Sequence, residues 1–190
     1  MVIDTTPGTV CAYSNVGTEL MGHILEQVYD QSFEGLLQQH LFGPAEMPQA
    51  AIQLDADAEK QLANGYGEGR QAVPPVRNLL WGAAGGVCAT MPDVINYIKW
   101  QLDTTNPIVQ RTHTILYQDE LDAVGYYWPI RSNDIDGTHY AHHGGSFGTQ
   151  NWLSILPRHN MGLSIITNQS DPYTARKLMT TLQAILDDIR

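Results

Sequence analysis

Three scarcities narrow what this chain of 190 residues can be. It has only two cysteines, Cys11 and Cys88, which form neither a disulfide scaffold nor a metal-spaced pair. It has 10 basic residues against 20 acidic ones, and the net charge of −10 argues against nucleic acid or an anionic membrane as its main partner. No apolar run approaches the ~18–20 residues that a transmembrane helix requires.

The composition fits a globular protein. The hydrophobic fraction of 43% lies near the norm, and there is no low-complexity tract. We expect a single domain over residues 1–190, with a helical region at about 14–105 and a sheet with a C-terminal helix at about 124–190. The first ten residues lack the basic and apolar regions of a signal peptide. As given, the chain would be cytoplasmic unless a signal lies upstream.

Two helices are predicted near the N-terminus. Ser14 or Asn15 can cap the first helix, in which apolar residues recur at every fourth position. Ser32 can cap a second helix over residues 32–40, and the segment 42–48, which contains two prolines, ends it. The apolar positions are Val16, Leu20, Ile24 and Val28 in the first helix, and Phe33, Leu36, Leu37 and Leu41, facing inward, in the second.

The rest of the chain predicts an α+β fold. Glycines and prolines between residues 49 and 80 predict a long surface excursion, and Thr90 and Asp93 mark the start of a helix over residues 92–102. Residues 124–130 are rich in β formers, and "NWLSILP" and "GLSIITN" predict two antiparallel strands joined at residues 157–160. A final helix over residues 173–190 should pack on that antiparallel sheet.

Two short stretches could carry chemistry. Tyr13-Ser14-Asn15 sets a phenol and an amide at a helix start, although a capped helix with a half-buried tyrosine explains it equally well. In "HHGGSFG", residues 142–148, three glycines allow close approach of the backbone to a ligand and leave N–H groups free to stabilise an oxyanion. The structural alternative is a tight bend at a sheet edge with surface histidines.

The histidines also raise a metal alternative. His139, His142 and His143 include the commonest type of metal ligand. However, adjacent residues of a strand point to opposite faces, and no nearby Cys, Asp or Glu completes a tetrahedral site. We therefore expect neither a metal nor another cofactor.

Taken together and in this order, several stretches resemble one family. They are "PGTVCAYSN", "QSF" followed by "FGP", "AAGGVCATMPDVINYI", and "HHGGSFGTQNWLSILPRHNMGLSIITN". The chain is similar to the serine β-lactamase-like family, which contains class C β-lactamases, D-alanyl-D-alanine carboxypeptidases and related esterases. The resemblance runs from Pro7 to the C-terminal helix. It implies part of a β-lactamase/transpeptidase-like fold, with an antiparallel sheet flanked by helices.

The resemblance implies a hydrolase that forms an acyl-enzyme. In the family, the serine of a Ser-x-x-Lys motif attacks the carbonyl of a β-lactam, D-peptide or ester, and water then releases the product. Tyr13 would move protons, which requires its ordinary pKa of ~10 to be lowered or its proton to be relayed. Asn15 would bind the substrate amide. His142 would replace the cation of the third motif and contact Tyr13 or a substrate carboxylate.

The same resemblance assigns roles to the residues that follow His142. The backbone N–H of Gly145 would form one half of the oxyanion hole, the other half being the N–H of the nucleophile. Gly144 and Ser146 would bind substrate. The expected partner is a small molecule or peptide with a carbonyl group.

One departure from the family is large. Ser-x-x-Lys precedes Tyr-x-Asn by a long segment in the family, whereas only twelve residues precede Tyr13 here. The lysines are Lys60, Lys99 and Lys177, and only Lys177 has a hydroxyl residue three positions earlier, Thr174, in the expected C-terminal helix. The chain thus looks like the C-terminal part of such an enzyme, truncated and inactive alone, and whether it is an enzyme by itself stays uncertain.

Two further expectations follow. Sheet edges that missing strands would pair with should be exposed or covered by a second copy, which predicts a homodimer or strand exchange. The alternative function is a non-catalytic module that binds a ligand or peptide in the same cleft.

Overall fold

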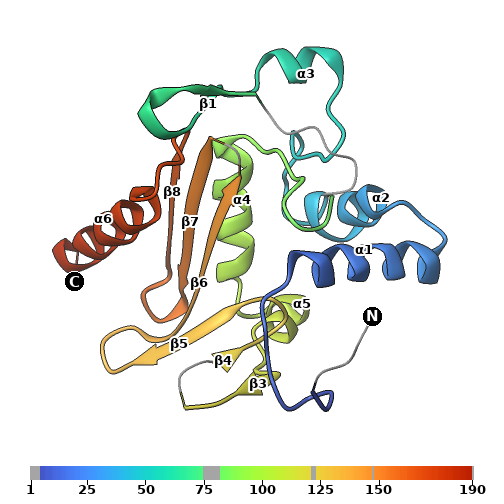
Figure 1. The fold of residues 1–190 in the computed structure, drawn as a ribbon. Coiled ribbons are helices and arrows are strands. Elements are labelled where there is room, and N and C mark those ends of the chain that lie inside the picture. The colour runs from blue at the N-terminus through green and yellow to red at the C-terminus, as the bar shows by residue number, and fades with distance from the viewer. Residues whose placement is uncertain (1–4, 75–81, 121–122, 147, 190) are drawn as a thin grey trace.

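The computed structural model describes residues 5–74, 82–120, 123–146 and 148–189. Helices dominate the first half of the chain, and an antiparallel sheet with one covering helix forms the second (Figure 1). The elements in chain order are α1 (Asn15–Tyr29), α2 (Phe33–Leu37), the π-helical turn η1 (Gln38–Phe42), α3 (Ala56–Lys60), β1 (Gly65–Tyr66), the 3-10 turn η2 (Glu68–Arg70), β2 (Ala72–Val73), α4 (Met91–Leu102), α5 (Pro107–Thr112), β3 (Tyr117–Gln118), β4 (Ala123–Val124), β5 (Pro129–Asn133), β6 (Gly137–Ser146), β7 (Thr149–Leu156), the 3-10 turn η3 (Pro157–His159), β8 (Met161–Thr167) and α6 (Thr174–Asp188).

The main sheet has six strands in the order β3-β4-β5-β6-β7-β8, and every neighbouring pair is antiparallel. Because each strand follows its neighbour along the chain, the sheet is a simple meander. Helices α4 and α6 both contact β7 and β8. This architecture confirms the predicted α+β class with an antiparallel sheet flanked by helices.

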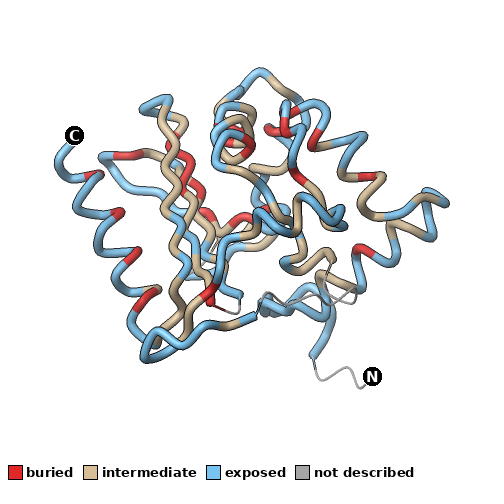
Figure 2. The backbone as a smooth tube through the Cα atoms, turned by 90° about the horizontal axis from the view of Figure 1, so that it is seen from above, coloured by how far each residue is buried: buried red, intermediate tan, exposed pale blue. Residues whose placement is uncertain are grey.

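The two faces of the sheet have separate apolar clusters. On one face Ile98 of α4 packs with Ile155, which is fully buried. On the other face Leu182 and Leu186 of α6 pack with Leu156. In Figure 2 the buried positions of α6 lie along its side toward the sheet, whereas the stretch before α1 is exposed. Because side chains along β7 alternate between the two faces of the sheet, this strand contributes residues to both clusters.

The predicted helix starts are confirmed. Ser14 accepts a hydrogen bond from Gly17 N, and Ser32 accepts one from Gly35 N, each at 3.1 Å. Thr90 forms a capping box with Asp93, whose carboxylate accepts from the Thr90 N–H at 2.9 Å. These signals are local, which explains why the sequence reveals them.

The apolar stripe of α1 is not buried. Val16, Leu20, Ile24 and Val28 are 71%, 49%, 43% and 69% exposed. The helix packs instead through Gly22, its one buried residue, where an added Cβ would lie 2.8 Å from Ala83 Cβ. The apolar residues at every fourth position predicted the helix correctly, but they do not mark the side of α1 that packs against the rest of this chain.

Four other expectations need correction or a limit. Residues 124–130 are not one strand, because the chain bends after β4 and Tyr127 takes a left-handed φ of 63° before β5 begins. The second helix continues past His40 as η1. Between the predicted helix at 92–102 and residue 124, where no element was predicted, the chain forms α5. Short strands do occur in the excursion at 49–80, but its residues 75–80 lie outside the described part, as does residue 190 of the last helix. The joined strands at 157–160 are confirmed as β7 and β8.

No helix in the described ranges combines the length and apolarity needed to cross a bilayer.

Candidate functional site

The N-terminal end of α1 fixes the positions of Tyr13 and Asn15. Ser14 is the N-cap, with an extended backbone (φ −150°, ψ 116°) and a hydroxyl bound to the Gly17 N–H. Because Ser14 itself caps the helix, capping does not account for the presence of Tyr13 or Asn15. Asn15 is the first helical residue, and Tyr13 stays in the extended segment before it, 73% exposed rather than half-buried.

β6 has strand partners on both sides over only part of its length. β5 pairs with residues 137–140, whereas β7 pairs with residues 140–146. Among the described residues, the segment 141–146 therefore has β7 on one side and no strand on the other. We call this segment the open half of β6. Backbone N–H and C=O groups point alternately to the two sides of an antiparallel strand, so this edge offers unpaired hydrogen-bonding groups.

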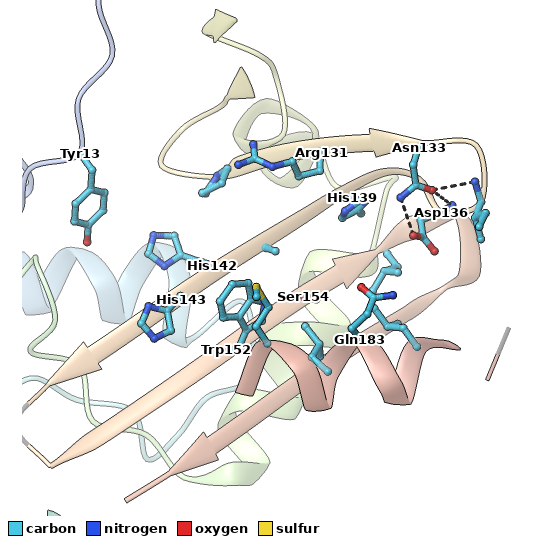
Figure 3. Close-up of a pocket in the computed structure, with 17 residues that line it drawn as sticks. Tyr13, Arg131, Asn133, Asp136, His139, His142, His143, Trp152, Ser154 and Gln183 are labelled. Carbon is cyan, nitrogen blue, oxygen red and sulfur yellow. Dashed lines mark hydrogen bonds between the residues drawn. The ribbon is translucent and has the colours of Figure 1, made fainter. Parts of the chain in front are cut away.

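Tyr13 lies beside the open half of β6, next to His142. The two ring centroids are 6.2 Å apart, with an interplanar angle of 53°. Figure 3 shows the Tyr13 side chain directed toward His142 from outside the sheet. The fold thus brings together two of the residues that the resemblance assigned to one site.

His142 is partly buried, and its environment favours the neutral imidazole. Burial lowers the pKa of His142 below the ordinary value of 6.5, and the charge of His143 acts in the same direction. A hydrogen bond with the backbone of His143 opposes this shift only in part. This environment favours the neutral imidazole over the cation that the resemblance implies at this position.

The three histidines of the metal alternative have different partners. His143 lies on the other face of β6, where its Nε2 is 3.4 Å from Gln150 Oε1 and its ring is 5.5 Å from that of Trp152. His139 Nδ1 lies 3.2 Å from Gly137 O. Within the described ranges, no three His, Cys, Asp or Glu side chains are grouped as metal ligands.

Gly145 is a glycine that the fold does not require. Its φ is outside the left-handed region, and an added Cβ would meet Gln150 Cγ at 3.5 Å, an ordinary contact. At Gly144 a Cβ would lie 2.9 Å from Asn151 Nδ2, the end of an exposed side chain. Packing therefore leaves room for a side chain at Gly145, which is exposed on the open half of β6. Ser146 ends the strand and is exposed.

A cavity of about 710 Å³ begins at this site and extends along the sheet to α6. Tyr13, His142 and His143 lie at one end of it (Figure 3). Asn15, Gly144, Gly145 and Ser146 do not line it, so the structure does not gather all six expected residues around one hollow. The wall residues that sequence reasoning missed include Arg131, Trp152, Ser154 and Gln183.

None of the three lysines lines this cavity. Lys60 is paired with Asp57 at 2.7 Å on α3, and Lys177 is exposed on α6. Thr174 is buried and accepts a hydrogen bond from Asp171 N at 3.0 Å. Thr174 and Lys177 therefore belong to the start of α6, as their place in the sequence indicated, and neither lines the cavity.

Curated relatives cover different lengths of this chain. The D-aminopeptidase of Cereibacter sphaeroides is 30% identical over 102 residues, which is 52% of this chain and 19% of that protein. Protein flp of Staphylococcus aureus is 25% identical over 179 residues, 90% of this chain and 36% of that protein. The chain spans about a third or less of the length of these curated relatives.

Solved structures share the fold at low sequence identity. The D-alanine carboxypeptidase of Burkholderia cenocepacia superposes with a TM-score of 0.81 at 20% identity and covers 94% of this chain and 62% of its own. A class C β-lactamase of Rhodobacter sphaeroides gives 0.78 at 21% identity, with 92% and 60% covered. The family model for β-lactamase matches residues 1–188. The chain therefore belongs to the β-lactamase family, whose members include serine hydrolases of this fold.

Proposed function

We propose that this chain carries the proton-handling and oxyanion-facing half of a serine hydrolase site. The reaction would be acyl-enzyme hydrolysis of an amide or ester carbonyl, and the chain alone would bind substrate without acylation. The observation that carries the proposal is the placement of Tyr13 beside His142 at the open half of β6. No serine in the sequence is followed three residues later by lysine, so the family's nucleophile is not among these 190 residues.

The geometry supports separate roles for Tyr13, His142 and Gly145. A phenol and a neutral imidazole whose rings are 6.2 Å apart can both contact one polar group of a ligand. The neutral imidazole of His142 can accept a hydrogen bond from a ligand group that also contacts the Tyr13 hydroxyl. The open edge at Gly145 offers a backbone donor for a carbonyl oxygen that gains charge. The ligand would lie along β6, extending the sheet.

The relatives suggest the substrate class. Two of them are named D-aminopeptidase and D-alanine carboxypeptidase, names that describe reactions of peptides with D-residues. We extend this class to the present chain as a proposal: a D-amino acyl amide or ester, or a β-lactam. Asn15 would bind the amide of such a substrate from the start of α1.

The covalent step is tested by intact mass measurement after incubation with a β-lactam. We expect no adduct on the 190-residue chain. A longer form that carries Ser-x-x-Lys ahead of Tyr13 is expected to gain the mass of the acyl group. If the longer form binds the β-lactam without acylation, the alternative of a non-catalytic binding module is favoured. Stable acylation of the 190-residue chain would contradict the proposal.

Replacing Tyr13 with phenylalanine should weaken binding of a D-alanyl peptide about fivefold, because one hydrogen bond to the ligand is lost. Isothermal titration calorimetry measures the affinity. Tyr173→Phe is the matched control, since Tyr173 is 68% exposed against 73% for Tyr13 but lies before α6. Equal affinities of the two variants would remove Tyr13 from the site.

Replacing Gly145 with alanine should leave the fold intact and still weaken the same ligand about tenfold. The added methyl group has room against Gln150 but occupies the path of a ligand along the open half of β6. Thermal denaturation checks the fold, and Gly82→Ala provides a control, since a Cβ there also makes only ordinary contacts. Unchanged affinity would show that the ligand does not run past Gly145.

A further inference from the structure

A glycine-rich loop at residues 82–86, "GAAGG", is held against α1 by one carboxylate. Glu19 of α1 accepts hydrogen bonds from two consecutive backbone N–H groups of this loop, from Ala84 N at 2.7 Å and from Ala83 N at 3.2 Å. We call this contact the Glu19 clamp. Hydrogen bonds to an ionised carboxylate are roughly twice as strong as those between neutral groups, so the clamp ties the loop firmly to the helix.

The loop lies directly on α1 beside the clamp. An added Cβ at Gly22, three residues after Glu19, would lie 2.8 Å from Ala83 Cβ, so only a glycine allows this approach without a shift. Within the loop, Gly86 N donates to Gly82 O at 3.1 Å. The clamp therefore fixes a short, closed turn against one face of the helix.

Asn15 lies on the same face of α1 as the clamp. Residues four apart in a helix are neighbours on its surface, and Asn15 precedes Glu19 by four positions. Four residues correspond to a rise of about 6 Å, so the loop is attached one turn from the start of the helix. A shift at the clamp would therefore reach Asn15 within a single turn.

The carboxylate of Glu19 does not serve the end of its own helix. The first turn of α1, where a negative charge stabilises a helix, contains no acidic residue. A comparable contact occurs on α2, where Glu34 accepts hydrogen bonds from Ile52 N at 2.8 Å and Gln53 N at 3.2 Å. Glu34 follows the other end of α1 in the chain, so it offers a matched control for a clamp that does not hold the start of that helix.

We propose that Glu19 is a positioning residue of the candidate site. By holding the loop at residues 82–86 on α1, it fixes the orientation in which Asn15 meets the substrate. The inference rests on the proposed function, in which Asn15 binds the substrate amide. In this role Glu19 acts through Asn15 and does not contact the substrate.

Hydrogen exchange measured by NMR tests the link without a ligand. Glu19→Gln keeps the size of the side chain but removes its charge and one of its two acceptor oxygens. We expect about tenfold faster exchange at the two amides of the clamp, and faster exchange at Gly17 and Thr18, whose amides bond to Ser14 at the start of α1. Glu34→Gln should leave these amides unchanged. Unchanged exchange at Gly17 and Thr18 in Glu19→Gln would overturn the inference.

A double-mutant cycle, measured by isothermal titration calorimetry, tests the link to the substrate. Glu19→Gln should weaken binding of a D-alanyl peptide about fivefold in the parent chain, but less than about twofold in Asn15→Ala, where no side-chain amide remains to be positioned. Glu34→Gln should not change the affinity. Urea denaturation of both glutamate variants checks that a difference in stability does not explain the result.

The outcomes separate this inference from the proposed function. Unchanged affinity in Glu19→Gln, an equal loss in the parent and Asn15→Ala backgrounds, or an equal loss in Glu34→Gln would overturn the positioning role. A parent chain with no measurable affinity would contradict the proposed function instead. The exchange rates at Gly17 and Thr18 would then still decide whether Glu19 positions the start of α1.

Discussion

Replacing Gly148 with alanine is expected to lower the free energy of unfolding by about 3 kcal/mol. Gly148 has a φ of +74°, which costs an L-residue about 1–2 kcal/mol. An added Cβ would also lie 2.6 Å from Gly65 C, Gly65 Cα and Tyr66 N. These are backbone atoms, so no side-chain rotation relieves the overlap. Overpacking of this kind costs a further ~1–3 kcal/mol.

The matched control is Gly69→Ala. Gly69 has a similar φ of +66°, but nothing lies within 4 Å of the added Cβ. It should therefore show the conformational cost alone, about 1 kcal/mol. Urea denaturation of both variants measures the difference. If the two variants are equally destabilised, the close approach of Gly148 to Gly65 contributes nothing.

The same substitution should loosen the segment that Gly148 holds. Tyr66 N donates to Gly148 O at 3.1 Å and to Asn168 O at 2.9 Å, and Ser170 N donates to Tyr66 O at 2.8 Å. These bonds tie β1 to the ends of β7 and β8. Faster hydrogen exchange at the amides of Tyr66 and Ser170 in Gly148→Ala would report their loss.

Two glycines of the stretch "HHGGSFG" thus differ in whether the fold requires a glycine at their position. Gly148 is required by a positive φ and by the backbone of β1, whereas Gly145 has room for a side chain. The sequence predicted close approach for the stretch as a whole. It could not separate approach to a ligand from approach to another part of the chain, since Gly65 and Gly148 are far apart in sequence. Residue 147 of this stretch lies outside the described part.

Local signals predicted much of the fold. The caps at Ser14, Ser32 and Thr90 depend on contacts within a few residues, and the β7–β8 hairpin needs only two apolar runs around a turn. The bend between β4 and β5 was missed because it depends on a non-local contact. A Cβ at Gly125 would lie 2.8 Å from Thr112 O, near the end of α5.

The site was predictable only as separate residues. Tyr13 and His142 were identified by resemblance, and the fold places them together. The neutral state of His142 depends on burial in the folded sheet, which a sequence does not show. The cavity walls at Arg131 and Trp152 arise because α6 covers one part of a sheet face and leaves another part open, which only the packing determines.

Acid should destabilise this fold through His113, and His113→Phe should remove that effect. The imidazole is stacked on Tyr140, with ring centroids 3.7 Å apart and an interplanar angle of 12°, and meets the edge of Trp128. Its Nε2 is buried without a hydrogen-bond partner among the described residues. Burial lowers the pKa of His113 from 6.5 to about 4.

The direction of the pH dependence follows from this shift. Between pH 6.5 and about 4, the unfolded state binds a proton at His113 that the folded state does not. Stability is therefore lost as the pH falls through this window, by about 2 kcal/mol once partial exposure is allowed for. Asp93 and Asp171 have carboxyl pKa values lowered from 3.8, so most of the stability that they contribute is lost at pH values below the window.

Urea denaturation of the parent and His113→Phe at pH 7.5 and near pH 4 measures the effect. Phenylalanine keeps the stack on Tyr140 and the edge contact with Trp128 but cannot be protonated, so the variant should unfold at clearly higher urea than the parent only in acid. His23→Gln is the control, because the side chain of His23 is 65% exposed. Parallel loss of stability in parent and variant between the two pH values would assign the acid sensitivity to other groups, His142 first among them, because burial lowers its pKa as well.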